Sequence, residues 1–378
     1  MKASILKLAA IVGLGLWLTP VNADDTIPIG LVAPISGSVA VDGQQEVAGA
    51  RFAVEEFNRN ARPGTKKVDL LVEDGECKPA ASTAAAEKLI TRNKVVALAG
   101  AFCSSATKAV QPISDRYRIP LVNGISSDPS LTNPVRPWFF RTKIHNGIRA
   151  KFYAKFIAEQ AKLKKLAALA IDDDFGRSAV ASFTPILKQY GAEFVTVRYF
   201  KHGEVNYVPM LNAMQSSGAD GLFLVGEAQD GGLIVKQYHQ LGLNLPIMAL
   251  GSFNTPEFFN AAGPDAEGVF NAEVWGYGVD NPAARAFAQA WGESHGGAYP
   301  GLYAMSGYVE LKTILEAIAK GGGADPARSK AALETLGWNS PIGAIKFDDQ
   351  HQAHTLMFVT KNEQGKGVVI RTYDTSQE

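Results

Sequence analysis

The chain has 378 residues, its 37 lysines and arginines are balanced by 37 aspartates and glutamates, and 46% of its residues are hydrophobic. This balance excludes the strongly basic class of chains whose partner is nucleic acid or an anionic membrane. The chain is longer than a domain with a single hydrophobic core usually is, so the sequence predicts two domains.

The first residues indicate export. Lys2 and Lys7 form a short basic region, and an apolar run follows over residues 8–18. This is the pattern of a secretory signal peptide, and its apolar run is too short to span a bilayer. We predict that residues 1–23 are removed, with cleavage after Ala23, and that the mature protein is soluble.

Short apolar runs alternate with longer amphipathic ones in the next part of the chain. Val47, Val54 and Phe57, for example, form one stripe of a predicted helix. Apolar and polar residues do not alternate within these runs, as they would in a half-exposed strand. This absence of alternation is typical of strands that helices cover on both faces. The sequence therefore predicts a parallel sheet of strand–helix–strand units. The expected strands are 26–33, 67–73, 95–102 and 119–123, and the expected helices are 44–60, 81–92 and one that begins at Ser104.

A second series of the same kind begins near residue 146, after a joining segment at 139–147. Two such series predict two similar α/β lobes. The expected strands are 165–171, 193–200, 220–226 and 245–251, and the expected helices are 151–161, 177–190 and 302–320. We also expect a hairpin formed by "AIKFDD" (344–349) and "TLMFVT" (355–360), and more than one passage of the chain between the lobes.

The loops that follow the strands are rich in Gly, Ser and acidic residues. Ligands of open parallel sheets bind beyond the carboxyl ends of the strands, so these loops predict a binding cleft. Ser104 begins a predicted helix, where backbone N–H groups converge and can hold an anion; it could also simply cap that helix. Three of these loops are "CSS" (103–105), "NGISSDPS" (123–130) and "GEAQDGG" (226–232).

Cys77 and Cys103 are the only two cysteines. In an exported chain, an even pair favours a disulfide over two free thiols. By the chain-entropy model such a bridge would contribute roughly 3.5 kcal/mol.

Several segments resemble the Leu/Ile/Val-binding type of periplasmic solute-binding protein, in register over essentially the whole mature chain. The segments are "IGLVAPISGSVAVDGQQEVAGARFAVEEFN", "DGEC", "AGAFCSS", "IPLVNGISSDPSLTNP", "FFRT", "DDDFGRS" and "GYVELKTILEAI". The resemblance implies a type I periplasmic-binding-protein fold, in which two Rossmann-like parallel-sheet lobes are joined by a three-strand hinge. The lobes would comprise residues 24–145 with about 278–350, and residues 146–277 with about 351–378.

The same resemblance implies a function and a cellular place. Members of the family close around a small ligand in the periplasm and deliver it to an ABC permease, so we expect a monomer with these partners. By the family pattern, Cys77 and Cys103 form the disulfide, and Ser104, Ser126 and Ser127 grip the α-carboxylate of the ligand. Hydroxyl and N–H donors suit an anion without an arginine. Ser105, in the same turn as Ser104, joins this predicted cradle.

The sequence departs from the family at the other end of the ligand. Gly251 and Ser252 stand where amino-acid binders of the family place a carboxylate for the ammonium group, while Glu227 and Asp42 stand where relatives have aromatic residues. Two further expected ligand contacts are Phe175, in place of a family tyrosine, and Tyr308, which matches an aromatic near the hinge.

An ammonium group buried without a partner costs several kcal/mol. We therefore expect an amino acid or close relative if Glu227 or Asp42 reaches its ammonium group, and otherwise an amide, a urea-like solute or an aromatic acid. Each of these residues could also have a structural role without touching a ligand. Glu227 could lie on the surface, Ser126 and Ser127 could form a turn, and Tyr308 could belong to the core.

Other classes of function fit the sequence less well. A serine hydrolase needs a G-x-S-x-G elbow with a later histidine, and neither this elbow nor a nucleotide-binding motif is present in the mature sequence. We therefore expect no enzymatic activity and no cofactor. The acidic run 172–174 and the pair His351 and His354 lack the spacing of a metal site. The alternative to a transport function is a ligand-sensing receptor module, because such receptors use the same fold.

Overall fold

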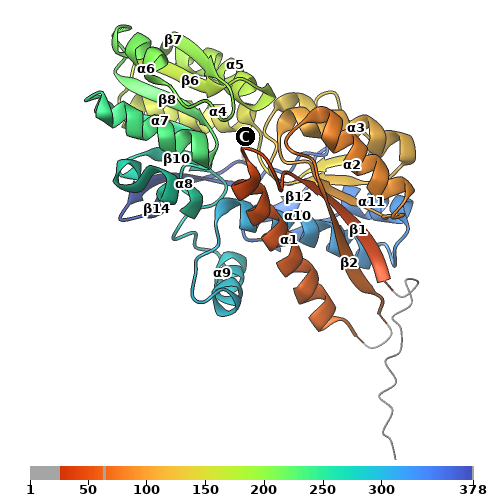
Figure 1. The fold of residues 1–378 in the computed structure, drawn as a ribbon. Helices are drawn as coiled ribbons and strands as arrows, with labels where there is room; N and C mark the ends of the chain where they lie inside the picture. Colours follow the sequence, from red (N-terminus) through yellow and green to blue (C-terminus); the bar gives the residue numbers. More distant parts are fainter. Residues whose placement is uncertain (1–25, 63–64, 377–378) are drawn as a thin grey trace, which may run out of the picture.

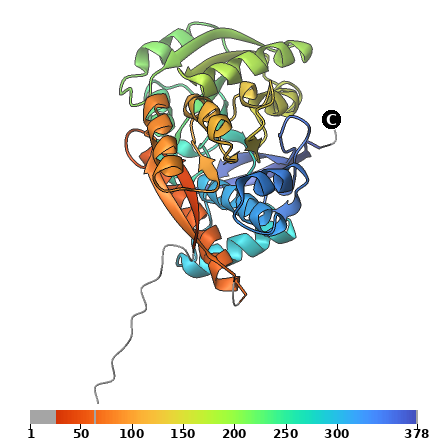
Figure 2. The ribbon, with the colours of Figure 1, turned by 90° about the vertical axis from the view of Figure 1, so that its right-hand side faces the viewer.

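The computed structural model describes residues 26–62 and 65–376, and the predicted signal peptide lies outside this range. Two separate sheets, each covered by helices, form two lobes (Figure 1). Figure 2 shows the green helices of one lobe at one end of the molecule and the orange and blue helices of the other lobe at the opposite end. This arrangement confirms the predicted α/β architecture of two lobes built on mostly parallel sheets.

The first sheet has the strand order β2-β1-β3-β4-β5, and each neighbouring pair is parallel. Its central strands are buried on both faces, as the continuous apolar runs predict. The strands are β1 (Thr26–Ala33), β2 (Lys67–Asp74), β3 (Leu98–Gly100), β4 (Leu121–Asn123) and β5 (Phe139–Arg141).

The second sheet has the order β14-β13-β10-β9-β8-β6-β7. The pairs from β10 to β7 are parallel, whereas β13 runs antiparallel to both β10 and β14. The strands are β6 (Lys165–Ile171), β7 (Glu193–Phe200), β8 (Gly221–Gly226), β9 (Ile247–Gly251), β10 (Phe270–Glu273), β13 (Leu356–Glu363) and β14 (Lys366–Asp374).

Helices separate most of the strands. The long helix α10 packs against α1 so closely that a Cβ at Gly49 would overlap the carbonyl of Ala304, and α10 therefore belongs with the first sheet. The α-helices are α1 (Ala40–Asn60), α2 (Pro79–Thr91), α3 (Ser104–Tyr117), α4 (Asn146–Lys155), α5 (Asp174–Gln189), α6 (Val208–Gln215), α7 (Ala228–Gln240), α8 (Pro256–Ala262), α9 (Pro282–Ser294), α10 (Leu302–Lys320) and α11 (Pro326–Glu334). None of the helices in the described part of the chain is long and apolar enough to cross a membrane.

The chain passes between the two lobes three times. It leaves the first sheet after β5, returns after β10, and leaves again between β12 (Gly343–Lys346) and β13. Buried polar contacts join two of these crossings, because the Arg141 side chain donates to Gln352 Oε1 at 2.6 Å and Gln352 donates to the Lys143 carbonyl at 2.9 Å.

The prediction of a hairpin from residues 344–349 and 355–360 is wrong. Residues 343–346 form β12, which pairs with β11 (Gly337–Ser340) in a separate two-stranded sheet. The later segment is β13, which pairs with β10 and β14 in the second sheet. The two segments touch through a single bridge between Phe347 and Ala353. Each segment is apolar because it packs on a different lobe, and a local pattern cannot reveal which partner a strand finds.

Candidate functional site

A small cavity lies between the carboxyl ends of the strands of the two sheets. Its volume is about 20 Å³, which is space for about one water molecule. The lining residues are Phe102, Cys103, Ser104, Ile125, Ser126, Ser127, Lys143, Asp173, Phe175, Glu227, Gly251, Glu273 and Tyr303. Five of the predicted ligand contacts therefore share one cavity.

The first wall is the start of α3. Cys103 precedes the helix in an extended conformation and forms a disulfide with Cys77, with the two Cα atoms 5.4 Å apart. The predicted bridge is thus confirmed. No side chain caps the helix and its first turn carries no acidic residue, so the free N–H groups at this end favour an anion. Cys103 and Ser104 both line the cavity.

Ser104 ties this helix to the loop after β4. Its Oγ accepts hydrogen bonds from the backbone N–H of Ser127 at 3.2 Å and of Asp128 at 3.3 Å. A hydroxyl that accepts two hydrogen bonds still has its own proton to donate. Ser104, which is 1% exposed, can therefore donate that proton to an oxygen of a ligand.

The other serines have different surroundings. Ser126 Oγ donates to the carbonyl of Phe102 at 2.6 Å and shares a hydrogen bond with Thr107 at 2.7 Å, so its hydroxyl mainly holds the loop. Ser127 Oγ donates to the carbonyl of Ile125 at 3.1 Å. Ser105 is half-buried and does not line the cavity.

Glu227 lies on the opposite wall, at the start of α7. Its Oε2 accepts hydrogen bonds from the hydroxyl of Tyr303 at 2.6 Å and from Ser252 at 3.0 Å. The aromatic ring of Phe175, near the start of α5, lines the same wall.

Asp42, near the start of α1, is a second buried carboxylate beside Glu227. Its Oδ2 accepts hydrogen bonds from Ser252 Oγ at 3.3 Å and from the backbone N–H of Ala228 at 3.4 Å, while its Oδ1 is buried without a hydrogen-bond partner. It is 2% exposed and does not itself line the cavity. Ser252 thus links two carboxylates that belong to different lobes.

Burial sets the charge of this wall. It raises the pKa of Glu227 to about 7, although the hydrogen bonds from Tyr303 and Ser252 act to lower that pKa. Burial, and then the charge of Glu227, raise the pKa of Asp42 well above its ordinary value. Among the described residues, neither carboxylate forms a salt bridge. The wall would therefore favour a positively charged group.

His202 lies between two acidic residues next to this wall. Its Nδ1 lies 3.1 Å from Asp230 and its Nε2 lies 3.6 Å from Asp173, which lines the cavity. Burial alone would lower the pKa of His202, but its interactions with Asp173 and Asp230 raise that pKa to about 10. His202 therefore stays positively charged at neutral pH and pairs with Asp173.

A buried ion pair that sequence reasoning missed forms the floor of the cavity. Lys143, on the first crossing, lies 2.9 Å from Glu273 Oε2 at the end of β10, and Arg149 lies 3.3 Å from the same oxygen. All three side chains are nearly inaccessible. The lysine is visible in "FFRTKIHNG", but nothing in the local sequence identifies a partner 130 residues away.

The cavity also contains Tyr303 instead of the aromatic residue expected from sequence. The hydroxyl of Tyr308 donates to Glu56 at 2.9 Å, and its ring packs 4.5 Å from that of Phe287, away from the cavity. Five residues advance a helix by roughly 500°, so Tyr303 and Tyr308 cannot face the same side of α10. Helical periodicity, applied to "LYAMSGY", would have separated them.

The acidic run at the start of α5 has structural partners. Asp172 pairs with Arg177 at 2.5 Å, Asp173 accepts a hydrogen bond from the N–H of Gly176, and Asp174 lies 3.7 Å from Lys108. Within residues 26–62 and 65–376, no group of three or more histidine, cysteine or acidic side chains is placed to hold a metal ion.

Known proteins resemble this chain over most of its length. The sequence matches the family described as periplasmic binding protein over residues 26–366. It is 24% identical over 328 residues to a leucine-, isoleucine-, valine-, threonine- and alanine-binding protein of Pseudomonas aeruginosa, and the match covers 87% of each chain.

Solved structures share the fold. A leucine-binding protein from Thermotoga maritima has a TM-score of 0.86 at 22% identity, and the match covers 93% of this chain and 100% of that one. A solute-binding protein of an ABC transporter from R. palustris, in complex with 4-hydroxybenzoate, has a TM-score of 0.83 at 25% identity, with 93% and 97% covered. These matches confirm the predicted type I fold, and the family match covers most of the chain. The chain belongs to the periplasmic binding protein family.

Proposed function

We propose that this protein captures a small solute with a carboxylate at one end and an ammonium group at the other, such as an amino acid or a close relative. One observation carries the proposal. The uncapped start of α3 and the Ser104 hydroxyl face a wall that carries Glu227, and among the described residues neither Glu227 nor Asp42, which is buried beside it, has a salt-bridge partner. The ligand carboxylate would accept hydrogen bonds from α3, and the ammonium group would neutralise the acidic wall.

Capture would proceed by closure of the two lobes. The cavity of about 20 Å³ is too small for an amino acid, so the walls must separate before a ligand of that size enters. The three crossings, near residues 145, 277 and 350, would act as the hinge and divide the lobes as the sequence predicts. Ligand contacts made with both walls at once then favour the closed form.

The family match supports a proposal for the place of action and for the partner. We propose that residues 1–23 direct export to the periplasm and are then removed, and that the closed, monomeric protein hands its ligand to an ABC permease.

An aromatic acid or an amide is the second candidate ligand. A pKa of about 7 leaves Glu227 protonated about half of the time at neutral pH, and a protonated carboxyl can donate a hydrogen bond to a hydroxyl or an amide oxygen. The similar R. palustris protein, whose structure contains 4-hydroxybenzoate, also supports an aromatic acid as the second candidate. The carboxylate of such a ligand would still lie at the start of α3.

A thermal-shift screen of the refolded, ligand-free mature protein tests the proposal. The panel would hold amino acids, simple amides, urea and hydroxybenzoates, because a ligand that binds only the folded state raises the melting temperature. We expect hits among amino acids, and Kd values from calorimetry that rise at least tenfold in Ser104→Ala. Ser294→Ala, at the exposed end of α9, is the matched control.

Hits confined to solutes that lack an ammonium group would overturn the amino-acid assignment and support the second candidate. No hit in the panel, or equal affinity of the Ser104→Ala and wild-type proteins for the best hit, would overturn the proposed cleft chemistry.

A further inference from the structure

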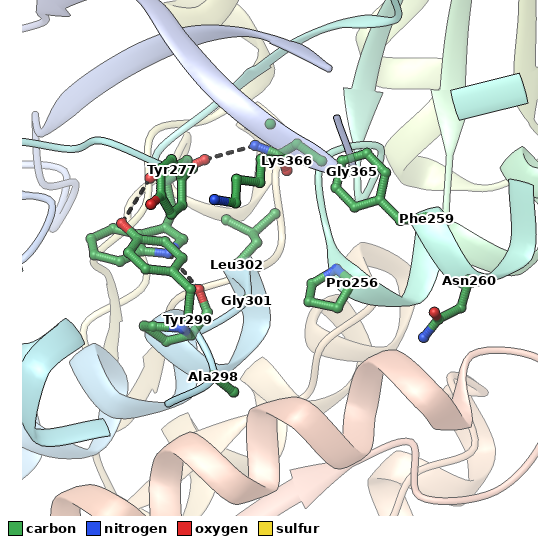
Figure 3. Close-up of a pocket in the computed structure, with 15 residues that line it drawn as sticks. Pro256, Phe259, Asn260, Tyr277, Ala298, Tyr299, Gly301, Leu302, Gly365 and Lys366 are labelled. Atoms are coloured by element: carbon green, nitrogen blue, oxygen red, sulfur yellow. Dashed lines mark hydrogen bonds between the residues drawn. The ribbon is translucent and has the colours of Figure 1, made fainter. Parts of the chain in front are cut away.

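A second and larger pocket lies beside the cleft (Figure 3). Its volume is about 340 Å³, within the range of small-molecule sites. In Figure 3, Tyr277 and Tyr299 stand on one side, Pro256 and Phe259 on the other, and Leu302 between them. The pocket is lined by Asn254, Pro256, Phe259, Asn260, Trp275, Gly276, Tyr277, Ala298, Tyr299, Pro300, Gly301, Leu302, Gly365, Lys366 and Gly367.

The walls of this pocket come from both lobes. Pro256 and Phe259 belong to α8, and Lys366 begins β14 in the second sheet. Leu302 begins α10, which packs against α1 in the first lobe. The two sides touch at Gly301, where a Cβ would lie 3.3 Å from Pro256 Cδ. The pocket is therefore formed by the arrangement of the lobes in this structure.

The aromatic side chains present apolar faces. The Trp275 indole N–H donates to the Pro300 carbonyl at 2.8 Å, and the Tyr299 hydroxyl donates to the Gly276 carbonyl at 3.0 Å. The ring of Tyr299 lies 5.6 Å from that of Trp275 and 5.0 Å from that of Tyr277. Tyr277 is 39% exposed, so part of its ring is open to solvent. Such a wall suits a flat aromatic ring.

One charge faces the rings. Among the described residues, Lys366 is the only charged one that lines the pocket, and its Nζ lies 4.3 Å from the centre of the Tyr277 ring. The described lining residues include no acidic side chain. A ligand with a negative group would pair with Lys366 while its ring lies against Tyr277 and Tyr299.

We propose that this pocket is a second ligand site, which takes a planar aromatic carboxylate. The ring lies between Tyr277 and Phe259, and the carboxylate pairs with Lys366. The site is distinct from the cleft, although they share one segment, since Leu302 lines the pocket and the next residue, Tyr303, lines the cleft. The assignment does not depend on which solute the cleft binds.

Fluorescence and calorimetric titration with 2-naphthoate tests the site, because this probe is planar, anionic and too large for the closed cleft. We expect the wild-type protein to bind it and Lys366→Gln to weaken binding at least fivefold. Tyr277→Ala should weaken binding by a similar factor. Both side chains are exposed enough for the variants to fold. Arg371→Gln, which removes a charge from the same strand away from the pocket, is the matched control and should bind like the wild type.

Two comparisons separate this site from the cleft. The neutral 2-naphthamide should bind the wild type more weakly than 2-naphthoate and should lose nothing in Lys366→Gln. Ser104→Ala and Glu227→Gln should bind 2-naphthoate unchanged, whatever they do to the cleft ligand. The proposal is overturned if the wild type does not bind 2-naphthoate, if Lys366→Gln and Tyr277→Ala bind it as tightly as the wild type does, or if Ser104→Ala abolishes its binding.

Discussion

The charge of Glu227 gives the cleft a pH dependence that can be calculated. Its pKa is raised to about 7, mainly by burial, whereas a glutamate in water titrates near 4.5. An ammonium group needs the ionised form of Glu227. The ionised fraction is about a tenth at pH 6 and about nine tenths at pH 8, so affinity for an amino acid should rise about tenfold between these values.

The groups around Glu227 support this assignment. Tyr303 and Ser252 donate hydrogen bonds to it, and neither titrates between pH 6 and 8, because burial raises the pKa of Tyr303 well above its ordinary value. The pKa of His202 is about 10, so its charge is constant over the same range. Asp42 has a raised pKa and would change affinity in the same direction.

Calorimetric titration of one amino-acid ligand at pH 6, 7 and 8 measures the effect. Repeating the pH 7 titration in buffers of different ionisation enthalpy counts the released protons, for which we expect about half a proton per ligand. Glu227→Gln should bind more weakly at pH 8 and lose most of the pH dependence. Glu56→Gln, far from the cleft beside Tyr308, is the matched control. An affinity that does not change with pH in the wild type, or the same slope in Glu227→Gln, would refute the reasoning.

Three further predictions concern the same walls. In the ligand-free protein, the raised pKa of Glu227 makes the folded state bind more protons than the unfolded state between pH 4.5 and 7. The free energy of unfolding should therefore fall by on the order of 3 kcal/mol as pH rises through this window, and the loss should stop above pH 7. Urea unfolding that shows identical pH profiles for Glu227→Gln and the wild type would contradict this prediction. Tyr303→Phe removes a hydrogen bond that lowers the pKa of Glu227, so the midpoint of the pH–affinity curve should move upward; an unchanged midpoint would argue against the contact. Lys143→Met leaves Arg149 as the charged partner of Glu273 and should cost about 3–5 kcal/mol in the free energy of unfolding. The double variant with Glu273→Gln should cost less, and a single-variant loss below about 1 kcal/mol would show that the pair is not desolvated.

Much of the fold could be predicted from the sequence because its strands are short, continuous and apolar. The strands at 26–33 and 165–171 have the predicted bounds, since both are buried almost throughout and end at polar loops. The strand at 193–200 and the helix at 302–320 also have the predicted bounds. The bounds of several other elements differ. Helix α1 begins at Ala40, four residues before the predicted start, which places Asp42 in its first turn. Acidic residues are favourable there because of the helix dipole.

The candidate site could be predicted only in part. Ser104 begins the helix after β3, and Ser126 and Ser127 lie in the loop after β4. Since β3 and β4 are neighbouring strands of the first sheet, topology alone brings the three serines together. Lys143 and Glu273 come from two different crossings, and their pairing depends on how the lobes are arranged. A contact between segments so distant in sequence leaves no local pattern, and the same holds for the hydrogen bond between Tyr303 and Glu227.

The central claim is that one wall of the cleft holds the carboxylate and the other the ammonium group of the solute. A crystal structure of the mature protein with the amino acid that gives the largest thermal shift tests it most directly. We predict a ligand carboxylate oxygen within hydrogen-bond distance of the first N–H groups of α3 and of Ser104 Oγ, and a ligand nitrogen within hydrogen-bond distance of Glu227 or Asp42. A carboxylate bound to Lys143 instead, or a nitrogen that contacts neither acid, would contradict it.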